Sequence, residues 1–309
     1  MPPIIEVKQL SKRFGDIHAV KDLSFTVNQG DVYGFLGQNG AGKSTTIRML
    51  LTLIRPTSGE IFIQGKNIDA HRNEILQITG AVIERPDLYS YLTAAENLKV
   101  FARLSGIRPS RKLMMEKLEQ VGLSERADSK VWTFSQGMKQ RLGIAVALVH
   151  DPSLIILDEP TNGLDPQGIA DMRKLIISLS RDFGKTLLVS SHLLGEMEQI
   201  ATRMIIIDRG SKVVEGEMKD LLDPEHVVLE ISTTDNHACS VWLGSSAWAS
   251  YVQPGNDAIS VLKIHRNEIP ALARELVLAG VNILSIKPKN TLEEYFLSLT
   301  NPLNDVEPH

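Results

Sequence analysis

The chain has 309 residues, of which 43% are hydrophobic and 23% are charged. This composition is typical of a folded protein with one large or two modest domains, and it excludes intrinsic disorder as the main state. The 33 Lys and Arg residues against 37 Asp and Glu residues leave a net charge of -4. Because no global positive field would attract a phosphate backbone, the charge argues against nucleic acid as the main ligand.

Cysteine usage and hydropathy indicate the compartment. Cys239, the single cysteine, can form neither an internal disulfide nor a cysteine-based metal cluster, which suits a reducing cytoplasm. The longest apolar stretch, residues 142–149, is far shorter than the roughly 18 to 20 residues that cross a bilayer. Residues 1–6 lack the basic and apolar regions of a secretory signal. We therefore expect a chain that is neither exported nor inserted in the membrane.

The N-terminal part is predicted to begin with an antiparallel sheet. Residues 4–10 and 19–27 have the composition of strands and are separated by turn residues. Residues 31–36 form an apolar run typical of a buried strand, and residues 43–53 have the length and composition of a buried helix. The sequence thus predicts a strand, a glycine-rich loop and a helix in succession.

That glycine-rich loop matches the G-x-x-x-x-G-K-[ST] phosphate-loop pattern. Glycines let backbone N–H groups converge on phosphate oxygens, and the helix N-terminus adds the positive end of its dipole. Lys43 is predicted to hold the β and γ phosphates, and the Ser44 hydroxyl to bind Mg²⁺. The residues assigned to nucleotide binding on this basis are Gly37, Gln38, Asn39, Gly40, Ala41, Gly42, Lys43, Ser44 and Thr45.

A helical insertion is expected over about residues 88–150. Thr93 and Glu96 have the spacing of a capping box, which predicts the start of a helix. Residues 110–121 predict a second helix, ended by Gly122. A third helix is predicted over residues 142–149.

Two acidic residues follow the next buried strand. The apolar runs 153–158 and 186–190 show no alternation, which predicts central strands of a mostly parallel sheet. Asp158 and Glu159 would then lie at the carboxyl edge, where parallel sheets bind ligands. Asp158 can complete the Mg²⁺ shell, and Glu159 can polarise the water that attacks the γ phosphate.

The C-terminal part predicts a second unit. Strands are expected at 227–232 and 281–286, two further strands are joined near Gly255-Asn256, and a short helix and the helix 269–279 separate them. This βαββαβ order is ferredoxin-like. We therefore expect a first domain over residues 1–222 and an accessory α+β domain over residues 223–309.

The segment before the third predicted helix carries a family resemblance. Phe134 to Arg141 reads FSQGMKQR and resembles the L-S-G-G-Q signature of ATP-binding cassette (ABC) ATPases, with Ser135 standing 23 residues before Asp158. With the motifs already described, the resemblance covers about residues 4–222. It implies an α/β P-loop NTPase of the ABC type, with a mixed sheet, an antiparallel β subdomain and a helical insertion, followed by a small α+β domain.

The resemblance also assigns roles to further residues. Ser135 and Gly137 would contact the γ phosphate of ATP bound to a partner subunit of a homodimer. Asp165, in Gly163-Leu164-Asp165, resembles the loop that crosses the dimer interface. His192 resembles the switch histidine that contacts the γ phosphate, and Phe14 stands where the family places an aromatic ring on adenine.

Two departures from the usual family pattern point to one branch. Glu84 stands where most members have a glutamine, and Gln136 and Met138 replace residues of the signature. These features, together with the tail 291–297, resemble the branch typified by bacitracin and lantibiotic self-protection exporters. Glu84 joins Ser44 and Asp158 as an expected metal ligand, because its carboxylate can present an oxygen to Mg²⁺.

The resemblance implies an ATP-hydrolysing subunit that docks on a separate membrane permease at the cytoplasmic face of the membrane. The exported substrate would be a peptide antibiotic or another amphipathic compound, which implies antibiotic resistance. We expect permease contact between Glu84 and the helices after Tyr91. One alternative is a soluble ABC ATPase that acts on DNA or ribosomes, although coiled coils and a second cassette are not seen in the sequence. The other is a small-molecule kinase, which leaves the Ser135 segment and His192 unexplained.

Overall fold

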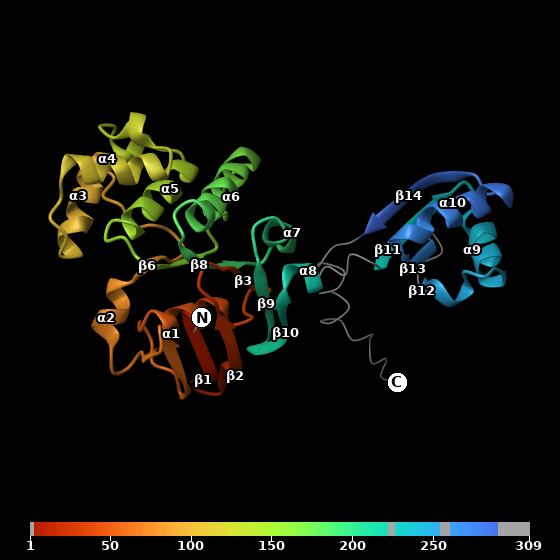
Figure 1. Ribbon diagram of the computed structural model, residues 1–309, viewed down its shortest axis with the longest axis horizontal. Helices are drawn as coiled ribbons and strands as arrows, with labels where there is room; N and C mark the ends of the chain where they lie inside the picture. Colours follow the sequence, from red (N-terminus) through yellow and green to blue (C-terminus); the bar gives the residue numbers. More distant parts are fainter. Residues whose placement is uncertain (1–2, 222–225, 254–259, 290–309) are drawn as a thin grey trace. The chain divides into compact units, whose positions relative to one another are not determined.

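The structure is a computed structural model that describes residues 3–221, 226–253 and 260–289 (Figure 1). The chain divides into two compact units, Met1–Gly216 and Glu217–His309, and each is described by itself. The predicted boundary between residues 222 and 223, the turn near Gly255-Asn256 and the tail 291–297 lie outside the described residues. The division into two separately folding domains therefore stays a prediction.

A mixed six-stranded sheet forms the centre of the first unit, with strand order β10-β9-β3-β8-β7-β6. The strands from β9 to β6 pair in parallel. Every residue of β3, β7 and β8 is buried, as the unbroken apolar runs predict. The six strands are β3 (Val32–Leu36), β6 (Thr79–Val82), β7 (Leu154–Asp158), β8 (Thr186–Ser191), β9 (Arg203–Asp208) and β10 (Ser211–Glu217).

An antiparallel sheet packs beside it, with strand order β2-β1-β4-β5. Its strands are β1 (Ile5–Phe14), β2 (Ile17–Val27), β4 (Ser58–Ile63) and β5 (Lys66–Asn67). The two first strands extend further than predicted, because pairing continues until Phe14 meets Ile17 across the Gly15-Asp16 turn. Phe25 of this sheet stacks on Tyr33 and contacts Phe35 of the central sheet, so one hydrophobic core joins the two sheets.

The α-helices that the described part of the first unit has outside the insertion are α1 (Lys43–Leu50), α2 (Arg72–Gln77), α6 (Pro166–Arg181) and α7 (Leu194–Met197). Helix α1 contacts β7 and β2, whereas α6 contacts β3 and β8. The prediction that the first helix continues to residue 53 is wrong. The helix ends at Leu50 with Leu51 as its C-cap, and the next residue, Thr52, has a left-handed φ of 57° that cannot continue the helix.

The helical insertion consists of α3 (Ala94–Leu104), α4 (Arg111–Gln120) and α5 (Gln136–Ala147), which contact one another (Figure 1). The predicted capping box is confirmed, because Thr93 Oγ1 accepts from Glu96 N at 3.1 Å and Glu96 Oε2 accepts from Thr93 N at 2.7 Å. The start predicted for the third helix at residue 142 is wrong. Ser135 caps the helix, so it begins at Gln136 with polar residues in its first turn.

The second unit consists of β11 (His226–Thr233), α9 (Asn236–Ser245), β12 (Val252–Gln253), β13 (Ser260–His265), α10 (Ile269–Leu278) and β14 (Ile283–Lys289), after the short helix α8 (Met218–Leu221). The antiparallel sheet has the order β12-β13-β11-β14. This order, with the βαββαβ succession of elements, is that of a ferredoxin-like fold. The unit has a hydrophobic core of its own, which includes the buried Cys239.

Candidate active site

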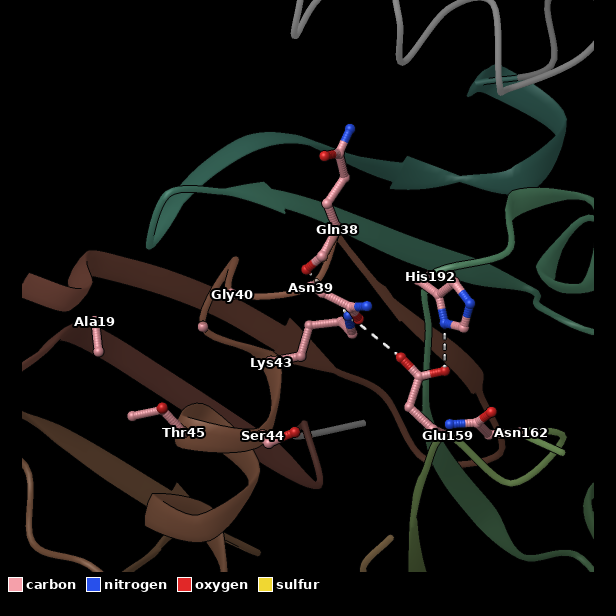
Figure 2. A pocket seen from close by; sticks show the side chains of 11 residues that line it. Ala19, Gln38, Asn39, Gly40, Lys43, Ser44, Thr45, Glu159, Asn162 and His192 are labelled. Atoms are coloured by element: carbon pink, nitrogen blue, oxygen red, sulfur yellow. Dashed lines mark hydrogen bonds and ion pairs between the residues drawn. The ribbon is translucent and has the colours of Figure 1, made fainter.

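A pocket opens at the carboxyl ends of β3, β7 and β8, where parallel sheets bind ligands (Figure 2). The space measures about 340 Å³. It is lined by Ala19, Gln38, Asn39, Gly40, Gly42, Lys43, Ser44, Thr45, Glu159, Asn162 and His192. The structure thus brings most of the phosphate loop, one of the two acids and the histidine together in one place.

The loop between β3 and α1 can take its path only with glycine at two positions. Gly42 has a φ of 105°, and a Cβ there would lie 2.5 Å from the carbonyl oxygen of Ala19. A Cβ on Gly37 would lie 2.6 Å from the carbonyl oxygen of Ile207. Gly42 is also the N-cap of α1, and no side chain among the described residues caps that helix. Its first N–H groups therefore remain available to an anion.

Lys43 is a buried cation whose ammonium group lies near three oxygen atoms of the described residues. Its Nζ donates to the carbonyl oxygens of Gly37 at 2.6 Å and Gln38 at 3.3 Å. The same nitrogen lies 3.3 Å from Glu159 Oε1. A buried ammonium needs such partners, because burial without them is costly. A phosphate group in this pocket could take the place of Glu159 as the counter-ion of Lys43.

Glu159 connects the lysine to the histidine (Figure 2). Its Oε2 lies 2.8 Å from Nδ1 of His192, which follows β8. Its backbone φ of 50° is left-handed, a conformation that is unfavourable for a residue with a side chain. The carboxylate therefore bridges Lys43 and His192 across the pocket.

Asp158 is buried, and its two oxygens differ. Oδ1 accepts from the Ser190 hydroxyl at 2.5 Å, whereas Oδ2 has no hydrogen-bond partner among the described residues. A buried carboxylate oxygen without a donor is costly unless a cation satisfies it. Mg²⁺ prefers oxygen ligands. The Ser44 hydroxyl lines the pocket, whereas Asp158 is not one of its lining residues and directly precedes Glu159, which is. These residues therefore fit a magnesium ion.

Glu84 lies outside these pocket-lining residues. It follows β6 with a left-handed φ of 56°, and its Oε1 accepts from Nη2 of Arg48 on α1 at 2.8 Å. Its carbonyl oxygen accepts from Nε2 of Gln140 on α5 at 3.3 Å. The carboxylate is thus held by an arginine, and its predicted role at the nucleotide and the metal stays a prediction.

The remaining predicted residues are also outside the pocket lining. Phe14 is half exposed at the end of β1, with Lys12 Nζ 5.0 Å from its ring centroid. Ser135 and Asp165 are the exposed N-caps of α5 and α6, and Gly137 lies in the first turn of α5. Their predicted contacts with adenine or with a partner subunit remain predictions.

Several functional contacts escape sequence reasoning. Ala19 and Asn162 line the pocket, although no motif marks the first of them. Arg48 holds Glu84, although the two are far apart in the sequence. Ser190 contacts Asp158 from the neighbouring strand. Its signal in the sequence was a serine inside an otherwise apolar buried run.

A phosphate loop between β3 and α1, acids at the end of β7 and a histidine after β8 define a P-loop ATPase. The helical insertion and the antiparallel sheet assign it to the ABC type. A family model described as "ABC transporter" matches residues 20–162. The sequence resemblance to ABC ATPases is thereby confirmed.

Relatives extend over almost the whole chain. The bacitracin transport ATP-binding protein BcrA of Bacillus licheniformis is 42% identical over 97% of this chain and 98% of the relative. The Nod factor export ATP-binding protein I of Burkholderia orbicola is 38% identical over 96% of each. The linearmycin resistance ATP-binding protein LnrL of Bacillus subtilis is 34% identical over 96% of this chain and 98% of the relative. The chain belongs to the family of ABC transporter ATP-binding proteins.

Solved structures agree with this assignment. A chain that is part of the ABC transporter complex CbiONQ of Clostridium perfringens is 27% identical, with a TM-score of 0.66 over 72% of this chain and 92% of that chain. A dimeric ATP-binding cassette in a post-hydrolysis state with ADP and Pi is 27% identical, with a TM-score of 0.62 over 69% of this chain and 98% of that chain. The chain is thus an ATPase whose ATP hydrolysis is coupled to transport. Within the described ranges, no helix is both long and apolar enough to cross a bilayer.

Proposed function

We propose that this chain powers the export of a peptide antibiotic or another amphipathic compound through a separate integral-membrane permease, and so gives resistance to that compound. The observation that carries the proposal is the near full-length similarity to the bacitracin transport protein. Relatives named for Nod factor export and linearmycin resistance support export over import. Nucleic acid is not a proposed partner, because the net charge is -4.

The phosphate loop and Lys43 bind the phosphates of ATP. The N–H groups at the start of α1 and the Lys43 ammonium donate hydrogen bonds to the phosphate oxygens. The γ phosphate then replaces Glu159 as the ion-pair partner of Lys43. Ser44 and Asp158 hold Mg²⁺, which neutralises phosphate charge when bound. Thr45 and Asn39 line the same pocket.

Glu159 acts as the general base for the attacking water. Once the γ phosphate has replaced Glu159 as the ionic partner of Lys43, the Glu159 carboxylate is free to accept a proton from a water beside that phosphate. His192 keeps the carboxylate in place through the contact between Nδ1 and Oε2. The catalytic residues are therefore Lys43, Glu159 and His192.

A second copy of the chain completes each site. Ser135 and Gly137 at the N-terminus of α5 and Asp165 at the N-terminus of α6 belong to exposed or half-exposed segments outside the pocket of their own chain. The helix N-terminus of α5 suits the γ phosphate of ATP bound to another subunit. A related cassette forms a dimer with ADP and Pi, which supports a homodimer here.

The permease contacts an aromatic surface beside α3 that consists of Tyr89, Tyr91 and Trp132, all exposed. Hydrogen bonds fix the backbone of this surface. The amide of Asn97, which is fully buried, bonds both the N–H and the carbonyl oxygen of Tyr89, and Trp132 N donates to the carbonyl oxygen of Ser90 at 3.0 Å. Exposed Tyr and Trp side chains on a rigid segment are typical of binding hot spots. The chain is thereby peripheral at the cytoplasmic face of the membrane.

Expression of this chain with its permease in a bacitracin-sensitive bacterium tests the proposal. We expect the minimal inhibitory concentration of bacitracin, or of another peptide antibiotic in a panel, to rise. The matched Glu159→Gln variant should give no rise, and the chain should co-purify with membranes only when the permease is present. Equal sensitivity with wild type and variant across the panel would contradict export of this class of compound.

A further inference from the structure

One hydroxyl group touches both acids of the site. Ser190 is fully buried in β8, opposite Asp158 in the parallel register with β7. Its Oγ donates to Asp158 Oδ1 at 2.5 Å. The same Oγ accepts from the backbone N–H of Glu159 at 2.9 Å. A single side chain thus uses its donor on one acid and a lone pair on the other.

The first contact decides which oxygen of Asp158 is available to a cation. Because Ser190 occupies Oδ1, the carboxylate is held in one rotation, and the oxygen left without a partner among the described residues is Oδ2. Hydrogen bonds to ionised groups are among the strong ones in proteins. Without the Ser190 hydroxyl, the carboxylate could rotate, and both of its oxygens would be buried without a donor.

The second contact fixes the backbone from which Glu159 projects. The φ of 50° at Glu159 is a conformation that costs free energy and persists only where neighbours hold it. The Ser190 hydroxyl anchors the N–H of that residue. The anchored backbone directs the carboxylate to Lys43 and His192 rather than away from the pocket.

We propose that Ser190 is the positioning residue that sets the metal-binding oxygen of Asp158 and the carboxylate of Glu159 at the same time. This inference rests on the proposed hydrolysis of Mg²⁺–ATP. Ser190 acts through the two acids and touches neither nucleotide nor metal itself. Its loss should therefore weaken metal binding and slow hydrolysis together.

The test uses the full chain with Mn²⁺ as the probe, at saturating concentration of a non-hydrolysable ATP analogue, with free Mn²⁺ followed by electron paramagnetic resonance. Ser190→Ala should raise the Kd for Mn²⁺ by about tenfold, as expected for a lost hydrogen bond to a charged group. Ser190→Thr keeps the hydroxyl and should remain within about threefold of wild type. If Ser190→Ala does not fold, Ser190→Cys replaces it, because a thiol fills the space but donates only weakly.

Thr186→Val is the matched control. Thr186 is fully buried in the same strand, and its hydroxyl accepts from Gly30 N at 2.9 Å, away from the pocket lining. This variant should lower the free energy of unfolding without changing the Kd for Mn²⁺. An unchanged Kd in Ser190→Ala or Ser190→Cys, or an equal change in Thr186→Val, would overturn the proposal.

Steady-state kinetics separate this inference from the proposed function. In wild type we expect ATP hydrolysis that depends on Mg²⁺. Ser190→Ala should raise the Mg²⁺ concentration for half-maximal rate and also lower kcat, and Ser190→Thr should restore both. If the wild-type chain does not hydrolyse ATP, the proposed function is wrong and the inference fails with it. If wild type is active and Ser190→Ala matches it, only the role of Ser190 is wrong.

Discussion

Two neighbouring strands, β6 and β7, end in the same local arrangement with different consequences. Each is followed by a glutamate in left-handed conformation, Glu84 after β6 and Glu159 after β7. Each glutamate pairs with a cation of helix α1, which begins with Lys43 and has Arg48 in its last turn. One helix thus presents a cation to each of two adjacent strand ends.

Burial separates the two pairs. The side chains of Lys43 and Glu159 are 5% and 16% exposed, whereas those of Arg48 and Glu84 are 45% and 63% exposed. Solvent and salt screen an exposed pair, but they reach a buried pair far less. We infer that the buried pair carries chemistry and that the exposed pair can exchange partners at little cost. The difference teaches that a carboxylate's environment decides its role more than its place at a strand end.

The largest effect on the ATPase rate is expected from a change in the buried pair of Lys43 and Glu159. Glu159→Gln should lower the ATPase rate by at least about a hundredfold, because an amide does not accept the proton of water. Lys43, Ser44 and Asp158 still hold nucleotide and metal, so binding of a fluorescent ATP analogue should persist and an ATP-bound dimer should accumulate. Turnover assays and size-exclusion chromatography with ATP check both parts. A rate within a few-fold of wild type would remove Glu159 from its role.

The positions of the phosphate loop and of the acids at the end of β7 could be predicted well from the sequence. The phosphate loop has a fixed spacing from Gly37 to Ser44, and apolar runs without alternation identify β7 and β8. Because the carboxyl ends of parallel strands meet at one edge of a sheet, these patterns place Asp158 and Glu159 at the edge that binds ligands. Glu159 lines the pocket as that placement predicts, whereas Asp158 is not among the lining residues.

The exposed pair of Arg48 and Glu84 at the end of β6 could not be predicted in the same way. Arg48 reaches Glu84 only because α1 passes beside the end of β6, and no local pattern encodes such a distant pairing. The role of Ser190 depends on strand register, which pairs it with Asp158. The helix start at Gln136 was missed because its first turn is polar, and only the cap at Ser135 marks it.

A moderate effect is expected when the exposed carboxylate is changed. If Glu84 leaves Arg48 to meet Mg²⁺ or its water when the site closes, Glu84→Gln should shift the Mg²⁺ dependence of the ATPase and its stimulation by the permease, because the extra negative charge is lost. Nucleotide affinity should stay within several-fold. Glu84→Ala should have a larger effect, since it removes the oxygen as well. Magnesium titrations of the ATPase with and without permease measure this.

Arg48→Gln is the matched control for that experiment. It breaks the same ion pair but leaves the Glu84 carboxylate in place. A shift in Mg²⁺ dependence with the Glu84 variants but not with Arg48→Gln would assign the effect to the metal. No change in Mg²⁺ dependence, rate or export with either Glu84 variant would make Glu84 a surface acid that serves only Arg48.

The smallest effect is expected from the exposed ion pair itself. A double-mutant cycle with Glu84→Gln and Arg48→Gln should give a coupling free energy of unfolding of about 0.2 to 1 kcal/mol, the range measured for exposed pairs. Raising the salt concentration to about 1 M, where the Debye length falls to about 3 Å, should remove most of that coupling. Urea unfolding at low and high salt measures it. A coupling well above about 1 kcal/mol, or one that persists in high salt, would mean that this pair is desolvated like its buried neighbour. Glu84 would then not exchange partners freely, and the contrast between the two strand ends would be lost.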